Sequence, residues 1–239
     1  QTIEQQIGKA QSLQQQFVGN AASLSAQTAR SFDESYGVIA EISNKITEIS
    51  APLPGETQKY KDIGNILQAS LIRGYVDKKG NVDFAGFGQA VTGLSTNYGA
   101  LALGKGMGSQ NATLFLQRAL NGSSFAELNQ LEFGEKSPEV INAIKNELKK
   151  MGYTELKSIQ GLAKRASLLE RATKPFISDE FIEKSSSTIE GITESFNTKV
   201  FDQRVGIFGM FREVNDKGTG IKNAIEAYTK FLGAVIGDK

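Results

Sequence analysis

Residues 1–50 read QTIEQQIGKAQSLQQQFVGNAASLSAQTARSFDESYGVIAEISNKITEIS, a stretch without proline that is rich in Gln, Ser, Ala and Thr. Its large apolar residues recur mostly in alternating steps of three and four, which is the spacing of a coiled-coil seam. A continuous helix of this length would extend about 75 Å at roughly 1.5 Å per residue. We therefore predict an extended helical oligomerisation arm over residues 1–50. The residues predicted to form its oligomer interface are Ile3, Ile7, Phe17, Leu24, Phe32, Ile39, Ile42, Ile46 and Ile49.

The two halves of this arm are not in one register. Continued along the chain, the first seam reaches polar residues such as Thr28 and Ser31, whereas the second seam uses Phe32. A shift of one residue near positions 26–31 would reconcile the two, as a bend or a local change of supercoil. Glycines within the arm each cost a helix about 1 kcal/mol relative to alanine. We expect association to supply the missing stability; folding back on the helices after Pro54 is the alternative that the periodicity leaves open.

The rest of the chain predicts a mainly α fold. Residues 51–55 contain two prolines, which end the arm and form a linker. Residues 56–239 are expected to form a helical domain, in which the small and apolar residues 86–103 form a buried helix or helical pair. One small β-hairpin is predicted near residues 74–84, because Tyr75, Val76, Val82 and Phe84 flank a turn in which Gly80 can adopt positive φ. The predicted fold is thus a long coiled-coil-like helix followed by a multi-helix domain with one hairpin.

Several helix boundaries are marked by local signals. Ser124-Phe-Ala-Glu127 is a capping box, and Ser137-Pro-Glu139 combines an N-cap, a proline at the first helical position and a first-turn acid. The helix after Ser137 is expected to stop at Gly152. Thr154 is expected to cap another helix, and Ser178 to open one that runs towards Val200.

Composition excludes much familiar chemistry. The 239 residues carry a net charge of +1 and include neither cysteine nor histidine. The Ser-His-Asp triad, the Cys-His pair, thiolate metal sites and the HExxH zinc site are therefore excluded. The small net charge does not support general binding to nucleic acid. We predict no catalytic residues, no cofactor and no metal site, and because residue 1 is glutamine we expect a fragment or a processed product.

Three motifs suggest chemistry but are incomplete. Asp77, Gly80 and Asp83 resemble a calcium loop, but placing Gly80 at its sixth position leaves the twelfth without a glutamate, so a plain hairpin is preferred. The run Gly99–Gly106 matches a phosphate-binding loop up to Lys105, but glycine follows where a hydroxyl is needed.

Carboxylates are the third candidate. Glu132 and Glu135 lie in a predicted inter-helix turn, and Asp179, Glu180 and Glu183 begin a helix, where negative charge is favourable in any case. Paired carboxylates cleave glycosides in many enzymes. This is the basis of an alternative function, a tail-delivered cell-wall hydrolase domain.

An apolar segment near the end of the chain has two interpretations. Its large residues are Ile207, Phe208, Met210 and Phe211, interrupted by glycines and flanked by Arg204 and Arg212. A helix packed closely against a neighbour is preferred, and an interfacial membrane segment is the alternative. The second interpretation gives another alternative function, a helical membrane-active secreted effector.

Three segments resemble parts of phage tail tape measure proteins, most closely those of cyanobacterial phages and prophages. They are Phe115–Phe133 (FLQRALNGSSFAELNQLEF), Ser137–Val140 (SPEV) and Phe201–Val214 (FDQRVGIFGMFREV). The resemblance covers about residues 84–214. The chain is shorter than such proteins and lacks their hydrophobic spanning segments, which puts channel formation by this region in doubt.

The resemblance implies a structural protein of the virion rather than an enzyme. Tape measure proteins lie in the tail lumen, set tail length, contact the baseplate hub and leave ahead of the DNA during genome ejection. The implied partners are copies of the same chain, as a trimer or alternatively a hexamer, together with hub and tail tube proteins. Sequence-specific nucleic acid is not expected. Contact with the hub or the host membrane would fall on the segment around Phe208.

Overall fold

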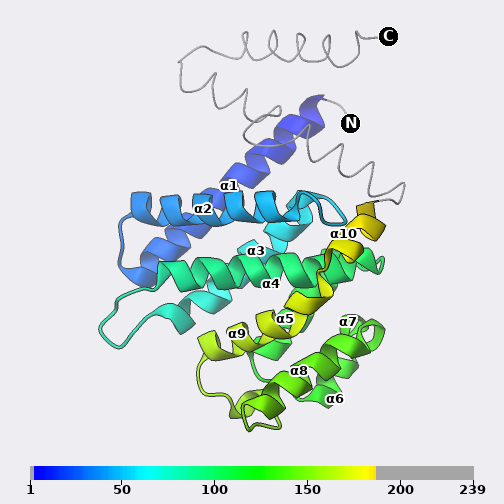
Figure 1. Ribbon diagram of the computed structural model, residues 1–239. Coiled ribbons are helices and arrows are strands. Elements are labelled where there is room, and N and C mark those ends of the chain that lie inside the picture. Colours follow the sequence, from blue (N-terminus) through cyan, green and yellow to red (C-terminus); the bar gives the residue numbers. More distant parts are fainter. Residues whose placement is uncertain (1–2, 187–239) are drawn as a thin grey trace, which may run out of the picture. The chain divides into compact units, whose positions relative to one another are not determined.

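Ten α-helices make up most of residues 3–186, the part of the chain that the computed structural model describes (Figure 1). They are α1 (Ile3–Thr28), α2 (Phe32–Ser50), α3 (Thr57–Leu71), α4 (Phe84–Gly104), α5 (Ser109–Leu120), α6 (Phe125–Asn129), α7 (Glu132–Lys136), α8 (Pro138–Lys150), α9 (Leu162–Thr173) and α10 (Asp179–Ser186). Single turns of 3-10 helix lie at Ile72–Tyr75, Leu156–Ser158 and Lys174–Phe176. The prediction of a mainly helical fold is confirmed for this part of the chain.

Residues 3–50 form two helices, so the prediction of one long helix is wrong, and the break falls at residues 29–31, within the interval where the two seams change register. The chain turns between α1 and α2 at Ala29, which has a φ of 52°. Ser31 then caps α2: its hydroxyl accepts a hydrogen bond from the Glu34 amide at 3.2 Å, and the Glu34 carboxylate accepts one from the Ser31 amide at 3.3 Å. A cap of this kind defines a helix start, because it satisfies amides that a continuous helix would have paired with the preceding turn.

The second seam of the predicted arm packs inside the chain. Ile39, Ile42 and Ile46 of α2 are 1%, 2% and 1% exposed, and α2 contacts α1, α3 and α4. Residues 1–186 group into one compact unit, within which Ala51–Gly55 joins α2 to α3. The apolar periodicity therefore identified three buried positions of α2, but Phe32 and Ile49 at the ends of the same seam are exposed, and the neighbouring helices belong to the same chain.

Helix α4 runs through the middle of this unit and contacts α2, α3, α5 and α9 (Figure 1). Its glycines bring neighbouring helices close: a Cβ on Gly99 would lie 2.7 Å from the Tyr60 ring, and one on Gly88 would lie 3.5 Å from Ile42. Tyr98 of the same helix is fully buried and packs against Phe115 and Phe133, with ring centroids 5.8 and 5.6 Å away. The predicted buried helix over residues 86–103 is confirmed.

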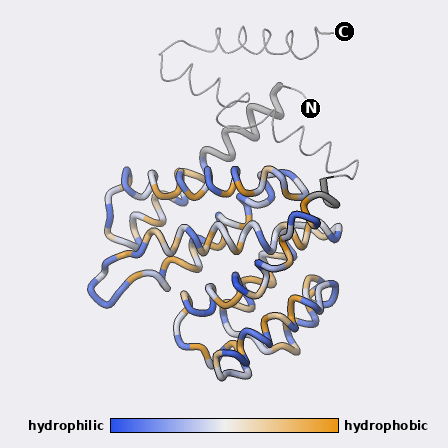
Figure 2. The backbone as a smooth tube through the Cα atoms, viewed as in Figure 1, coloured by the Kyte–Doolittle hydropathy of each residue, from blue (hydrophilic) through white to orange (hydrophobic). Residues whose placement is uncertain are grey.

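The predicted hairpin near residues 74–84 is reduced to one antiparallel bridge between Val76 and Val82. Tyr75 ends a 3-10 turn, and Asp83 accepts a hydrogen bond from the Gly86 amide at 2.9 Å, so that α4 begins at Phe84. No length of chain is left for paired strands. The loop between the bridged residues is hydrophilic (Figure 2), and Gly80 at its tip has the expected positive φ, 83°.

Of the helix boundaries predicted after α4, some are present in the structure and one is not. The Ser124–Glu127 capping box is present, Pro138 occupies the first turn of α8, and Gly152 has a φ of 79° just after α8 ends. The helix expected after Thr154 is only the 3-10 turn Leu156–Ser158, and α9 starts separately after Gly161.

Candidate functional site

An exposed aromatic cluster lies where α1 and α2 meet. The Phe17 and Tyr36 rings contact edge to face with centroids 4.8 Å apart, and Phe32 lies 5.9 Å from Tyr36. Phe32 and Tyr36 remain 41% and 40% exposed, and Val18, next to Phe17 in the chain, is 42% exposed. We call Phe17, Phe32 and Tyr36 the aromatic corner. Neighbouring aromatic rings left in water are typical of a surface that contacts another protein.

The structure divides the predicted oligomer interface into three groups. Leu24, Ile39, Ile42 and Ile46 are buried among helices of the same chain and cannot reach a second copy in this conformation. Phe17, Phe32 and Ile49 retain surface, with Phe32 and Ile49 more than two-fifths exposed. The side chains of Ile3 and Ile7 lie outside the described part of the chain. The prediction of self-association therefore rests on the aromatic corner and Ile49.

The candidate carboxylate Glu132 is held by a structural contact. Glu132 lies in the first turn of α7, and its carboxylate pairs with the Lys136 ammonium at 2.7 Å. The hydrogen bond from Lys136, followed by its charge, lowers the pKa of Glu132. A general acid needs a raised pKa so that it still carries its proton near neutral pH. Glu132 is thus unsuited to protonating a leaving group in this state. Asp179 and Glu180 do begin a helix, α10, as expected.

Lys105 ties two parts of the fold together. It follows the last residue of α4, and Gly99, the first residue of the supposed phosphate loop, lies inside that helix. The Lys105 ammonium donates to the Lys136 carbonyl oxygen at 2.6 Å and to the Ser137 hydroxyl at 3.1 Å, and pairs with Glu139. Its charge is used to join the end of α4 to the start of α8, and no loop here cradles a phosphate.

The supposed calcium loop is also closed by its own hydrogen bonds. One Asp77 carboxylate oxygen accepts from the amides of Lys79 and Asn81, both at 2.8 Å, and the other accepts from the Asn81 side chain at 2.9 Å. The side-chain hydrogen bond from Asn81 is the largest cause of the lowered pKa of Asp77. Asp83 is directed to the start of α4 instead. The two carboxylates therefore serve the turn and the helix cap.

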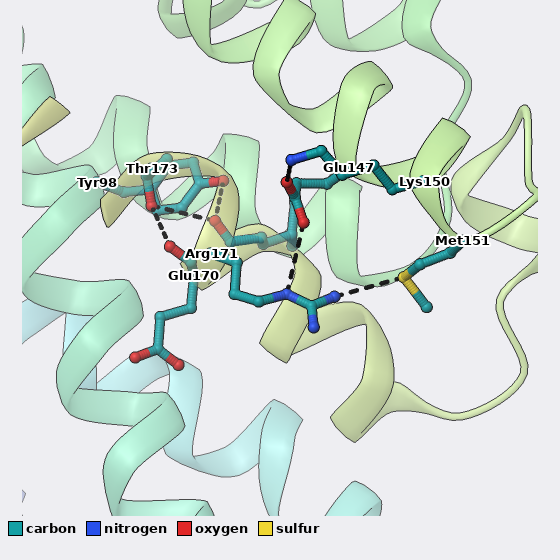
Figure 3. A network of polar contacts seen from close by, with 8 residues as sticks. Tyr98, Glu147, Lys150, Met151, Glu170, Arg171 and Thr173 are labelled. Carbon is teal, nitrogen blue, oxygen red and sulfur yellow. Dashed lines mark hydrogen bonds and ion pairs between the residues drawn. The ribbon is translucent and has the colours of Figure 1, made fainter. Parts of the chain in front are cut away.

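A polar network that the sequence did not predict joins α4, α8 and α9 (Figure 3). The buried Tyr98 hydroxyl donates to the Leu169 carbonyl oxygen at 3.2 Å, and the Thr173 hydroxyl donates to the same oxygen at 3.1 Å. Towards the surface, Arg171 reaches Glu147 at 3.6 Å. These contacts satisfy buried hydroxyls between helices, and burial raises the pKa of Tyr98 well above its usual value.

Glu170, beside this network, is half-buried against α4. A Cβ on Gly93 would lie 2.6 Å from its carboxylate, so the close approach depends on glycine. Burial raises the pKa of Glu170, partly opposed by the charge of Lys174. Burial, followed by the charges of Glu170 and Asp83, raises the pKa of Tyr75 to about 12. Glu170 is the half-buried carboxylate of this contact and Asp83 is exposed, so the two do not form a buried carboxylate pair.

The predicted hub or membrane contact, Ile207, Phe208, Met210 and Phe211, lies outside the described residues. Within residues 3–186, no helix combines the length and apolar character needed to cross a bilayer. The same part of the chain holds no group of three acidic side chains placed to bind a metal ion. No protein-family model, no curated protein and no solved structure matches the chain.

Proposed function

We propose that the chain is a non-enzymatic helical structural protein that self-associates through the aromatic corner. The observation that carries this proposal is the exposure of Phe32 and Tyr36 beside Phe17 at the junction of two helices. Fully burying a large apolar side chain stabilises an assembly by about 1.5–3 kcal/mol. Because about two-fifths of each of these two rings is still exposed, an interface would gain about 1 kcal/mol from each, in every copy.

We further propose that this assembly is part of a phage tail, as a tape measure protein. The support is the resemblance of Phe115–Phe133, Ser137–Val140 and Phe201–Val214 to segments of that family. The first two segments run from α5 to the start of α8, where Phe115 and Phe133 contribute buried rings. In this role the chain would lie in the tail lumen near the baseplate hub, help set tail length and leave ahead of the genome. A trimer is preferred to a hexamer.

Sedimentation velocity over a range of concentrations tests the self-association. Wild type is expected to form a discrete oligomer, and the double variant Phe32→Ser/Tyr36→Ser to remain a monomer. Leu114→Ser is the matched control, because Leu114 is 43% exposed on α5, outside the aromatic corner. A wild-type chain that stays monomeric at high concentration would refute the proposal, as would equal dissociation of the control variant.

Mass spectrometry of purified virions tests the tail assignment separately. The chain should be present in the tail fraction at a low copy number divisible by three. Its absence from virions would remove the tape measure proposal and leave the self-association result standing.

A further inference from the structure

A small cavity, partly open to solvent beside Ser23 and Gln27, lies where α1, α2 and α3 meet. Its volume is about 10 Å³, and the residues around it include Asn20, Ser23 and Gln27 of α1, Ile39 of α2, and Gln68 of α3. Both α1 and α3 contribute amide side chains to this lining. No charged side chain lines the cavity, so neither an anion nor a metal cation is matched by the site.

Two of the residues that line this cavity each carry a buried polar atom without a hydrogen-bond partner. These atoms are the Asn20 side-chain nitrogen, Nδ2, and the Gln68 side-chain oxygen, Oε1. Gln68 is only 6% exposed, so bulk water does not solvate its amide freely. A buried polar atom without a partner costs about 1–3 kcal/mol. One of these atoms is a donor and the other an acceptor, yet they do not bond to each other.

We propose that the cavity binds one water molecule, which accepts a hydrogen bond from Asn20 and donates one to Gln68. A single water needs about 10–15 Å³ and two to four polar partners. The cavity volume of about 10 Å³ is at the lower end of this range, and its lining residues carry the two unpaired atoms. The Ser23 hydroxyl, which accepts from Gln27 at 3.0 Å, stands at the same cavity as a third partner. The bridge links α1 to α3 and holds α1 on the helices below it. This inference is independent of the proposed function.

A double-variant cycle on the full chain tests the bridge. Asn20→Leu and Gln68→Met each remove one partner at similar volume and leave the other buried and unpaired. Each is expected to reduce the hydrogen-exchange protection of the α1 amides on the order of tenfold. The double variant removes both polar groups and expels the water, so its protection should lie within about threefold of wild type. Gln15→Leu, at an exposed position on α1, is the control and should change little.

If the two losses of hydrogen-exchange protection multiply in the double variant, to about a hundredfold, the proposal is overturned, because the two groups then act independently. Unchanged protection in both single variants would also overturn it. A direct measurement on wild type remains decisive if the variants do not fold. Nuclear Overhauser effects should connect the Asn20 side-chain amide protons to a long-lived water, and their absence would show that the cavity does not hold one.

Discussion

Two glycines of α4 provide a paired test of the packing around the central helix. Gly88 and Gly99 are both buried, and both lie inside the same helix. Replacing either by alanine should favour the helix by about 1 kcal/mol through backbone propensity alone. The two sites differ in what the new methyl group meets. At Gly88 it meets Ile42 at 3.5 Å, an ordinary van der Waals contact. We expect Gly88→Ala to stabilise the protein by up to about 1 kcal/mol.

At Gly99 the methyl group would lie 2.7 and 2.9 Å from two carbon atoms of the Tyr60 ring. That ring is fully buried, and its hydroxyl donates a hydrogen bond to the Pro54 carbonyl oxygen, so it has no free direction in which to move. Overpacking of this kind costs about 1–3 kcal/mol. Disturbing the hydrogen bond adds about 1 kcal/mol. After the gain in propensity, Gly99→Ala should destabilise the protein by about 2 kcal/mol.

Urea denaturation followed by far-ultraviolet circular dichroism measures both variants against wild type. The expected difference between them is about 3 kcal/mol, which moves the two midpoints in opposite directions. Equal shifts, or a Gly99→Ala variant as stable as wild type, would refute the close contact between α4 and α3. Such a result would mean that Tyr60 is not held where the structure places it.

Three further substitutions test other contacts. Ser31→Ala removes the cap between α1 and α2 and should cost about 1 kcal/mol in thermal unfolding; an unchanged midpoint would argue against a helix start at Phe32. Glu170→Gln should stabilise the protein at pH 7, because the raised pKa means that the folded state favours the protonated acid, and the advantage should vanish in denaturation below pH 4; an equal gain at both pH values would exclude titration as the cause. Lys105→Met should cost about 1 kcal/mol, measured by urea denaturation in low and high salt, and a change close to zero would mean that its contacts to Ser137 and Glu139 are dispensable.

The sequence predicted best those features that depend on neighbours in the chain. The capping box at Ser124, the proline at the start of α8 and the stop at Gly152 involve residues within a few positions of one another. Such signals act within one or two turns of the chain and depend little on the rest of the fold. The same kind of signal was present at Ser31 and Glu34, three residues apart in a capping box, and it marks the break where the apolar periodicity indicated only a shift of register.

The candidate site was harder to predict, because heptad spacing identifies a buried face and not its partner. Ile39 and Ile46 occupy seam positions whether they face another copy or α4 of the same chain. Phe32 belongs to the same seam but is the first residue of α2, where the core does not cover it. Its contact with Tyr36 follows from helical spacing, because residues four apart are neighbours on a helix, but the contact of Tyr36 with Phe17 of α1 could not be read from periodicity. The polar network around Leu169 joins residues more than seventy positions apart, beyond any local pattern.

The small residues of α4 explain why α2 packs into the core of its own chain. Gly88, Ser95 and Gly99 lie on one side of the helix, at spacings of seven and four residues. On α3, a Cβ at Gly64 would lie 2.6 Å from Ile46 and 3.7 Å from the Ser95 hydroxyl. Helices without side-chain bulk at their contact approach closely, and α2, α3 and α4 meet there with Ile46 filling the space. An extended arm without a partner would leave Ile42 and Ile46 in water, at a cost of about 1.5–3 kcal/mol each. The self-association that we propose would therefore use the apolar surface that this packing leaves exposed, which is the aromatic corner and Ile49.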